Sequence, residues 1–390
     1  MNIDQKMMVR VRRHLHMHPE LGWDLDETTA YVRQELDKIG VPYEFEKYGR
    51  NSIVATVNPQ KSVFTIGIRA DMDALPIQEK NEDKPYRSKY DGKMHACGHD
   101  AHTAMLVGTA KALYEMRDKI DCRVRLIFQP CEESRPSGAS VLCESGIMRD
   151  IDCIIMCHVN CNDPCGAPSS RAGVTNATSG ALKIVTRGKA VHIAAQHKGV
   201  DALAMGVRIY EGIQMLLSRE ADPFDTCVIA VATMHAGTTT ATNADQCELG
   251  GSIRCLRDST YAWARKRIEV IARSVCESMG GSCDVEIAEN PLPVAVNSDV
   301  MYRAFAETCE RALGAGSLLQ LEPSPGGEDF AYYEREKPGL LFGLGMRNDE
   351  LGFNQPAHTS AWDIDERGME NGVRLFVQFV SDHMGGIAGL

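Results

Sequence analysis

One nine-residue stretch of this chain, Met94–His102, is dense in side chains that can bind a metal ion or move a proton. A glycine separates Cys97 from His99, so the backbone can turn tightly and bring both side chains to one point. Thiolate and imidazole are good ligands for zinc-like metal ions. The alternative interpretation is a polar loop that happens to be rich in histidine. The stretch holds one thiol, three imidazoles and one carboxylate, in Cys97, His95, His99, His102 and Asp100.

Three apolar segments read as buried strands, and each leads into residues with similar chemistry. We expect long helices between these strands, which is the layout of an α/β domain with its site at the carboxyl edge of the sheet. The strands and the residues that follow them are Val63–Ala70 with Asp71 and Asp73, Arg123–Gln129 with Glu132 and Glu133, and Ile151–Cys157 with His158.

The adjacent carboxylates of Glu132 and Glu133 can take two different roles just past the end of a strand. One of them can bind a metal ion while its neighbour acts as general base on a water molecule at that metal. The two roles need separate residues, because a general base needs a free lone pair, whereas the lone pair of a metal ligand is already used in coordination. The alternative is a solvated acidic loop.

Five candidate ligands occur along the chain, which is too many for one tetrahedral catalytic metal that also keeps a position for water. They suit two metal ions that share a bridging ligand. Taken singly, each of the two histidines outside the dense stretch could equally be a buried core histidine. The five residues are Cys97, His99, Glu133, His158 and His358.

The element pattern changes at Ser179, where strands and helices begin to follow the order βαββαβ over the next hundred or so residues. That order is typical of a ferredoxin-like domain, here inserted into the α/β domain. We therefore expect a first part of the α/β domain at 1–179, the inserted domain at 180–290 and the second part at 291–390. The main helices are expected at Gln5–His18, Asp26–Ile39, Ala101–Tyr114, Val200–Ser218, Thr260–Met279, Ser298–Leu313 and Asp365–His383.

Composition narrows the class of protein. The 390 residues are 44% hydrophobic and 24% charged, as in an ordinary soluble globular protein. The formal net charge of −11 argues against nucleic acid or an anionic membrane as the main partner. No run of eighteen apolar residues is long enough for a membrane span, and residues 1–20 lack the apolar core of a secretory signal. We expect a cytoplasmic protein.

The fourteen cysteines are expected to be reduced thiols that act mainly as small buried hydrophobes. Four of them recur every four residues, at Cys153, Cys157, Cys161 and Cys165. They would form a stripe on a helix, but 151–159 reads as a strand and 160–168 as a loop. With no CxxC pair, a structural zinc or iron–sulfur site is disfavoured, although a thiol redox or iron–sulfur protein stays as an alternative.

Several motifs together resemble the M20 metallopeptidase family, and in particular its amidohydrolase branch of aminoacylases, hippurate hydrolases and auxin-conjugate hydrolases. The similarity spans nearly the whole chain. The family fold is a two-metal catalytic domain with an inserted ferredoxin-like lid, which agrees with the order of elements above. The matching segments are His14–Thr29, Arg69–Pro76, Met94–Thr103, Phe128–Glu133, Gly326–Phe330 and Pro356–His358.

The resemblance implies roles for individual side chains. Glu132 would be the general base, and Cys97 would act as a thiolate that can bridge the two metals. Asp71 and Asp73 would orient the ligands without binding metal themselves, or else cap a helix or form a turn. The metal ligands would be Cys97, His99, Glu133, His158 and His358. Structural or packing roles are expected for His95, His102, Asp100, His14, His16 and His18.

The inserted domain departs from the family pattern. His192 would polarise the scissile carbonyl oxygen, but the sequence before it, Gly188–Val191, carries Ala190 and Val191 in place of two glycines. Gln196 replaces a family proline, and Ala241 stands where the family has an asparagine. Asn243 could fill that role after a two-residue slip. Arg254 could bind a substrate carboxylate, with a surface ion pair as its alternative; Gly326 and Gly327 complete the substrate-binding candidates.

We therefore expect a metal-dependent amidohydrolase that cleaves the amide bond of N-acyl amino acids with a metal-activated water and Glu132 as general base. The alternatives are a dipeptidase or carboxypeptidase of the same family and a catalytically silent metal-binding protein. Two divalent ions are expected, zinc or manganese first and cobalt or nickel as alternatives. The partners would be a small-molecule N-acyl amino acid or dipeptide and further copies of the chain, in a homodimer or higher homo-oligomer formed through the lid.

Overall fold

The structure, a computed structural model, describes residues 3–61 and 63–390. Its internal contacts divide the chain into two units. The first unit runs to Thr175 and continues through Val296–Glu322 and Asp329–Leu390. The second unit consists of Asn176–Ala295 and Pro323–Glu328. The sequence suggested an inserted domain at 180–290, whereas the second unit begins at 176 and ends at 295. It also includes the short later segment Pro323–Glu328.

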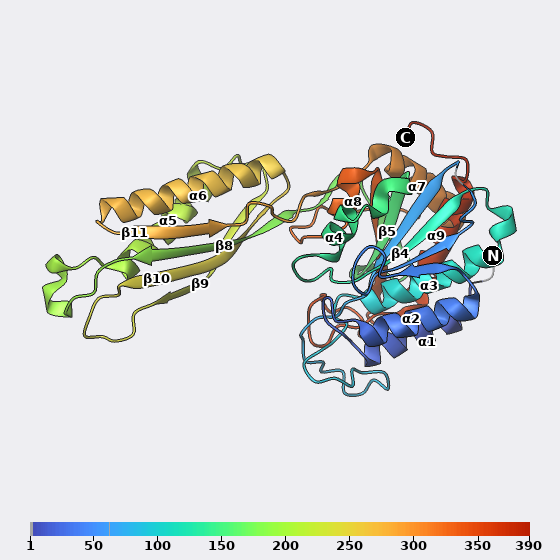
Figure 1. Cartoon of the computed structure of the whole chain (residues 1–390), viewed down its shortest axis with the longest axis horizontal. Helices are drawn as coiled ribbons and strands as arrows, with labels where there is room; N and C mark the ends of the chain where they lie inside the picture. The colour runs from blue at the N-terminus through green and yellow to red at the C-terminus, as the bar shows by residue number, and fades with distance from the viewer. Residues whose placement is uncertain (1–2, 62) are drawn as a thin grey trace. The chain divides into compact units, whose positions relative to one another are not determined.

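An eight-stranded mixed sheet, in the order β1-β2-β4-β3-β5-β14-β6-β13, forms the centre of the first unit (Figure 1). Its middle strands β4, β3, β5 and β14 are parallel to one another. Their carboxyl ends therefore meet at one edge, where α/β sheets place their sites. The strands are β1 Tyr43–Phe45, β2 Ile53–Val57, β3 Thr65–Asp71, β4 Arg123–Gln129, β5 Cys153–Pro164, β6 Pro168–Ser170, β13 Leu319–Gln320 and β14 Gly339–Arg347.

Side chains alternate between the two faces of this sheet, as the period of a strand requires. On β5, Cys153, Ile155 and Cys157 enter the larger apolar core, while Ile154 and Met156 enter a smaller core on the opposite face. Residues of α1, α2, α3, α7 and α9 fill the larger core, and residues of α4 and α8 contribute to the smaller one. These helices are α1 Gln5–Met17, α2 Asp26–Ile39, α3 His99–Glu115, α4 Gly138–Glu144, α7 Asp299–Leu313, α8 Ala331–Glu336 and α9 Met369–Asp382.

The second unit contains a four-stranded antiparallel sheet in the order β11-β8-β10-β9. Helices α5 and α6 pack against it (Figure 1) and share its apolar core. With this strand order, the succession β8-α5-β9-β10-α6-β11 is the ferredoxin-like arrangement that the sequence predicted. The elements are β8 Thr178–Arg187, α5 Ala202–Arg219, β9 Cys227–Ala236, β10 Gln246–Cys255, α6 Asp258–Ser278 and β11 Ser282–Ile287.

The α/β fold class is confirmed, with two corrections to its detail. First, β5 continues to Pro164, so the loop expected from 160 is partly strand and His158 lies within the strand instead of at its end. Second, the long helix expected between β4 and β5 is only the short α4 and a 3₁₀ turn, η2 Ile147–Asp150. The pattern also missed β7 Gly173–Asn176, β12 Ala295–Asn297, β6, β13, α8, η1 Arg117–Lys119, η3 Ile193–Lys198 and η4 Glu366–Gly368.

The four evenly spaced cysteines receive a simpler explanation from β5. Residues four apart on a strand share one face, and Cys153, Cys157 and Cys161 all pack in the larger core. The Cys165 thiol donates to the backbone carbonyl of Asp365 at 3.7 Å. Their spacing therefore reflects core packing on one sheet face.

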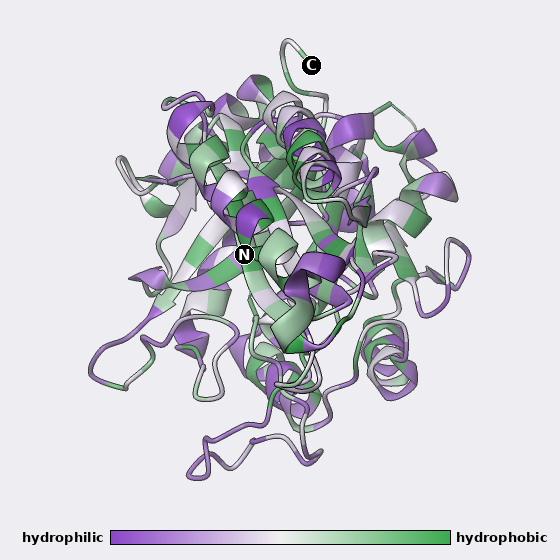
Figure 2. Cartoon of the chain, turned by 90° about the vertical axis from the view of Figure 1, so that its left-hand side faces the viewer, coloured by the Kyte–Doolittle hydropathy of each residue, from purple (hydrophilic) through white to green (hydrophobic). Residues whose placement is uncertain are grey.

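The distribution of polar and apolar residues can be followed along the chain. Figure 2 shows mostly hydrophilic residues along the long loops, whereas the helices and strands carry both hydrophilic and hydrophobic residues. Within 3–61 and 63–390, no helix combines the length and apolar character that a membrane crossing needs.

Candidate dinuclear metal site

The turn before α3 brings Cys97 and His99 to the carboxyl edge of the sheet. Gly98 caps the helix with a φ of +95°, a left-handed conformation that glycine adopts without steric cost. A Cβ at this position would lie 2.2 Å from Val159 and 2.9 Å from Trp362. The close approach of these two side chains therefore also requires glycine between the two candidate ligands.

Asp73 holds the adjacent carboxylates in place from beyond the end of β3. Its Oδ1 accepts the backbone N–H of Glu132 at 2.9 Å, and its Oδ2 accepts the backbone N–H of Glu133 at 3.2 Å. Its backbone carbonyl accepts a hydrogen bond from Nδ1 of His99 at 2.8 Å. One residue thus fixes the backbone of two neighbouring glutamates and the ring of one histidine.

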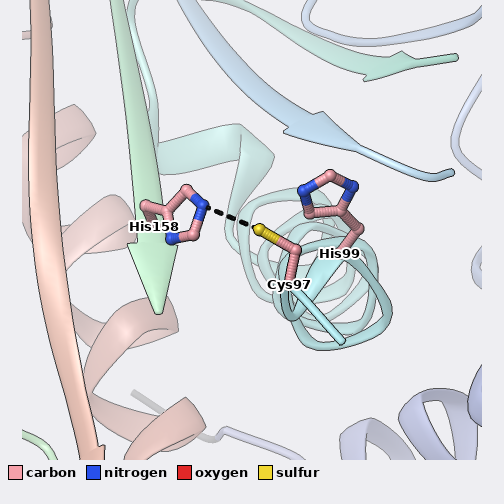
Figure 3. A group of neighbouring side chains, drawn as sticks. All are labelled: Cys97, His99 and His158. Atoms are coloured by element: carbon pink, nitrogen blue, oxygen red, sulfur yellow. Dashed lines mark hydrogen bonds between the residues drawn. The ribbon is translucent and has the colours of Figure 1, made fainter. Parts of the chain in front are cut away.

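Six side chains from four segments of the first unit converge at this edge. Sγ of Cys97 lies 3.5 Å from Nε2 of His158, and Figure 3 shows this contact with His99 beside it. Nε2 of His358 lies 3.3 Å from the same sulfur and 3.2 Å from Oε1 of Glu133. Three of the five groups of possible metal ligands among the described residues are drawn from these six side chains, with donor atoms within 4.8 Å of one another: Cys97, His99 and His158; Cys97, Glu133 and His358; His99, Glu132 and Glu133.

The imidazoles are oriented as metal ligands usually are. Nδ1 of His99 donates to the carbonyl of Asp73, and Nδ1 of His158 donates to the carbonyl of Val159 at 2.8 Å. The proton is therefore on Nδ1, and each Nε2 presents a lone pair to the centre. Nε2 of His99 is buried without a hydrogen-bond partner among the described residues. A buried nitrogen of this kind is satisfied by a cation, so the donor set fits two divalent metal ions.

The thiol of Cys97 supports the same interpretation. Burial raises its pKa well above the usual range, and the neighbouring His99 acts in the opposite direction without reversing the effect. Coordination to a metal cation deprotonates a thiol outright. As a metal ligand, Cys97 would therefore be a thiolate.

The segment that carries His358 is attached to the Cys97 segment through its backbone. The N–H of His358 donates to the carbonyl of Ala96 at 2.8 Å, and His358 itself adopts a φ of +65°. A non-glycine residue with positive φ is uncommon and is found at functional sites. The contact explains how a ligand from the C-terminal part of the chain reaches a turn more than 250 positions earlier.

A buried charged cluster on α1 lies directly behind the α3 turn. Arg12 donates from Nε to Asp100 at 2.9 Å and from Nη2 to Asp363 at 2.7 Å. Nδ1 of His16 contacts the same Asp100 oxygen at 2.7 Å, and its Nε2 lies 3.3 Å from Glu79. Burial and Arg12 oppose a charge on His16, but the two carboxylates prevail and raise its pKa to about 9. His16 therefore has an electrostatic role in addition to the expected packing role.

The remaining candidates from the sequence belong to the second unit. His192 is exposed and caps η3, where its Nδ1 accepts the N–H of Ala194 at 3.2 Å. Asn243 is buried; its Oδ1 accepts from Val191 at 2.7 Å and its Nδ2 donates to the carbonyls of Lys189 and Val200. The side-chain amide of Asn243 therefore fixes the 189–200 segment, a structural role that the sequence did not suggest.

Arg254 lies in the second unit on β10, and its Nη1 donates to the carbonyl of Pro325 at 3.1 Å. That carbonyl immediately precedes Gly326 and Gly327 in the short segment that joins the unit. A Cβ on Gly327 would lie 2.4 Å from Leu292, so the close packing of this segment requires glycine there. These contacts place Arg254 next to the segment that carries the glycine pair.

Sequence reasoning did not single out Arg69 or Asp329, and it treated His102 only as structural. All three are buried and hydrogen-bonded in a chain that reaches Asp71. One signal was available in the sequence. Arg69 and Asp71 are two residues apart on a strand and so share a face, and an arginine on a buried strand needs a carboxylate partner.

A thiol, three imidazoles and two carboxylates at the carboxyl edge of an α/β sheet have the chemistry of a dinuclear site in a metal-dependent hydrolase. Residues 67–382 match the description Peptidase family M20/M25/M40. The chain therefore belongs to this family, and the resemblance seen in its motifs is confirmed.

Relatives with printed activities agree with this class. The chain is 34% identical to thermostable carboxypeptidase 2 of Saccharolobus solfataricus over 360 residues, which is 92% of this chain and 91% of the relative. It is also 34% identical over 380 residues to IAA-amino acid hydrolase ILR1-like 4 of Arabidopsis thaliana, covering 97% and 86% of the two chains. This protein is a metal-dependent amidohydrolase.

A solved structure supports both the fold and the number of metals. The YxeP protein of Bacillus subtilis, described as a dinuclear metal binding peptidase from the M20 family, superimposes with a TM-score of 0.83. It is 29% identical to this chain, and the match covers 97% of each. Together with the three donor groups, this similarity supports two divalent metals here.

Proposed function

We propose that this protein releases a free amino acid from an N-acyl amino acid by hydrolysing the amide bond between them. The observation that carries the proposal is the pair Glu132 and Glu133, both held by Asp73 through their backbone N–H groups and both in one group with His99 whose donor atoms lie within 4.8 Å of one another. One carboxylate can bind metal while its neighbour keeps a lone pair for a proton. That separation is the requirement for metal-assisted hydrolysis of an amide.

Each residue then has one task in the reaction. The two bound metals would polarise the scissile carbonyl and lower the pKa of the attacking water. Glu132 takes a proton from that water at a carboxylate oxygen and passes it to the leaving amine nitrogen. Cys97, His99, Glu133, His158 and His358 hold the metals. His192 donates a hydrogen bond to the carbonyl oxygen as negative charge develops there.

We assign the second unit the role of a lid that recognises the amino-acid part of the substrate. The guanidinium of Arg254 uses one N–H for Pro325, and its other donors match the two oxygens of a carboxylate. The backbone of Gly326 and Gly327 lies next to it along the chain. Asn243 contributes indirectly, because its amide fixes the segment that carries His192.

Zinc is the metal that we propose first, because a thiolate and three imidazoles are soft or borderline ligands. Manganese is the second choice, since two carboxylates are also present and cellular supply affects occupancy. Reconstitution of metal-free protein with zinc, manganese, cobalt or nickel, followed by elemental analysis and an activity assay, decides between them.

The proposed substrate class is tested by a parallel screen of the metal-loaded protein. N-acetyl and N-aroyl derivatives of the twenty amino acids are compared with dipeptides of the same residues, and release of free amino acid is followed by mass spectrometry. We expect N-acyl amino acids to be cleaved at least about tenfold faster, a difference of about 1.4 kcal/mol in the barrier.

Faster cleavage of dipeptides would favour the dipeptidase or carboxypeptidase alternative, which the similarity to the Saccharolobus carboxypeptidase supports. A metal-loaded protein that cleaves neither class would support a silent metal-binding protein instead.

We also propose a homodimer formed through the outer strand of the second unit. Strand β9 is at the edge of its sheet and exposes Val228 and Met234, and such edges pair readily with a second strand. Two copies of β9 can pair around a two-fold axis and continue the sheet. Light scattering should give twice the chain mass for the native protein and a lower mass for V228K/M234K. Val270→Lys, at an exposed position on α6, serves as control.

The proposed location is the cytoplasm. All fourteen cysteines are free thiols, and reduced thiols persist in compartments that glutathione and thioredoxin keep reducing. Fractionation of cells that produce the tagged protein tests this, and recovery with exported proteins would contradict it.

A further inference from the structure

A chain of buried polar side chains leads from the interior of the first unit to the metal site. Arg69, 1% exposed, donates from Nη2 to Asp329, from Nε to Gln129 at 2.9 Å and from Nη1 to Oδ2 of Asp71 at 2.7 Å. The side chain of Gln129 also donates to Asp329 at 2.8 Å. The other oxygen of Asp71 contacts Nδ1 of His102 at 2.6 Å. Asp71 is therefore fixed from one side by Arg69, and it fixes His102 on the other.

The second nitrogen of His102 has a backbone partner next to a metal ligand. Nε2 of His102 accepts the N–H of Val159 at 2.9 Å. An atom that accepts from an N–H carries no proton, so Nδ1 holds the proton and donates it to Asp71. The carbonyl of the same Val159 accepts from Nδ1 of His158 at 2.8 Å. His102 and His158 thus hold the two polar groups of one residue, and their ring centroids are 4.8 Å apart.

The position of this contact along β5 explains why a side chain is needed there. The pairing of β5 with β3 reaches only to Met156 opposite Arg69, whereas β5 itself continues to Pro164 alongside β14. Past Met156, β3 no longer supplies partners for this edge of β5. At Val159 the imidazole of His102, instead of the backbone of β3, accepts the N–H of the strand. It fixes the strand directly next to His158.

We propose that His102 is a positioning residue, which is held by Asp71 and Arg69 and which directs His158 toward Cys97. It binds no metal and touches no substrate. It determines the backbone geometry from which Nε2 of His158 reaches the shared sulfur. Among the donor groups that the described residues form, His158 occurs only in that of Cys97, His99 and His158, so the effect falls on one of the two metal positions. The inference concerns metal binding and does not depend on the substrate class.

Two substitutions at His102 separate its two contacts. Asparagine places its donor near the position of Nδ1, so His102→Asn can keep the contact with Asp71 but is too short to reach Val159. Glutamine is longer, so His102→Gln can donate to Asp71 and accept from Val159 together. His383→Asn is the matched control, because His383 is a buried histidine at the far end of α9.

The measurement is a zinc titration of metal-free protein against a chromophoric chelator, which resolves two dissociation constants. In His102→Asn we expect one constant to rise about 10–100-fold, the usual effect of losing a residue that orients a ligand, while the other changes less than about threefold. His102→Gln should recover most of the loss. The thiolate absorption of the cobalt-loaded protein should change in the asparagine variant and not in the control.

A double variant gives the decisive comparison. If His102 acts through His158, adding His102→Asn to His158→Ala should cause little further loss, because the two act as one unit. Three results would overturn the proposal: two unchanged constants in a folded His102→Asn protein, equal weakening of both constants, or additive losses in the double variant. Thermal melting of each metal-free variant shows that the comparison is made on folded protein.

Discussion

Oδ1 of Asp73 accepts the backbone N–H of Glu132 at a distance of 2.9 Å. The other oxygen of Asp73 accepts the N–H of the next residue, Glu133. Asp73 therefore holds the backbone of both the proposed base and the neighbouring ligand, although it lies 59 residues before Glu132 in the sequence. The orientation of Glu132 is therefore set by the loop after β3 as well as by the strand β4 that precedes it.

Replacement of Asp73 by asparagine should disturb this anchor strongly. An amide has one accepting oxygen, and its NH₂ group would face the second backbone N–H. We expect metal affinity to fall about 10–100-fold, as for other residues that orient ligands, with kcat falling in parallel. Metal titration and initial rates measure both effects. Asp91→Asn changes an exposed aspartate three residues before the Met94–His102 stretch. It should leave metal affinity and kcat unchanged, and equal losses in this variant would refute the assignment.

Glu132→Gln should separate catalysis from metal binding. Glutamine keeps the shape of the side chain but cannot accept the proton of the attacking water, so activity should fall at least about 10²–10⁴-fold. The zinc content should stay near that of the native protein. By contrast, Glu133→Gln should lose metal as well as activity. Elemental analysis and hydrolysis assays distinguish the two variants, and normal turnover by Glu132→Gln would remove Glu132 from the mechanism.

Gly98→Ala should destabilise the fold and weaken metal binding together. The new Cβ would lie 2.2 Å from Val159 and 2.9 Å from Trp362, and overpacking of this kind costs about 1–3 kcal/mol. The left-handed backbone adds roughly 1–2 kcal/mol. Gly92→Ala is the matched control, because Gly92 also has positive φ but no atom within 4 Å of the new Cβ. Chemical unfolding of the two metal-free variants should differ by the steric contribution; similar values would contradict tight packing at Gly98.

The charge on His16 should make stability fall as the pH rises above neutrality. The folded-state pKa of about 9 lies above the ordinary value of 6.5, so folding favours the protonated ring. This contribution is complete below about pH 6.5 and is lost as the pH rises through 9, and it amounts to roughly 3 kcal/mol. His16→Gln should flatten the decline in melting temperature between pH 6.5 and 8.5. An unchanged decline in this variant would show that other groups cause it.

Local sequence patterns were sufficient to predict the positions of most of the longer helices and strands. The bounds of β4 are those predicted, because this strand is a run of suitable residues between clear turns. The bound of β5 was wrong because a strand ends where its partner ends, and its partner β14 lies about 180 residues further along. The short strands β6, β7, β12 and β13 were missed for the same reason.

The sequence by itself determined the α/β class, the inserted βαββαβ segment, and the residues with the right chemistry, Cys97, His99, Glu132, Glu133, His158 and His358. Side-chain period, turn residues and ligand type are local properties that a chain carries wherever it is placed. Only the tertiary structure decided that these six residues meet, which nitrogen of each imidazole faces the centre, and that Asp73 and His102 orient them. Those relationships depend on packing between segments far apart in the chain, and they have no local signature.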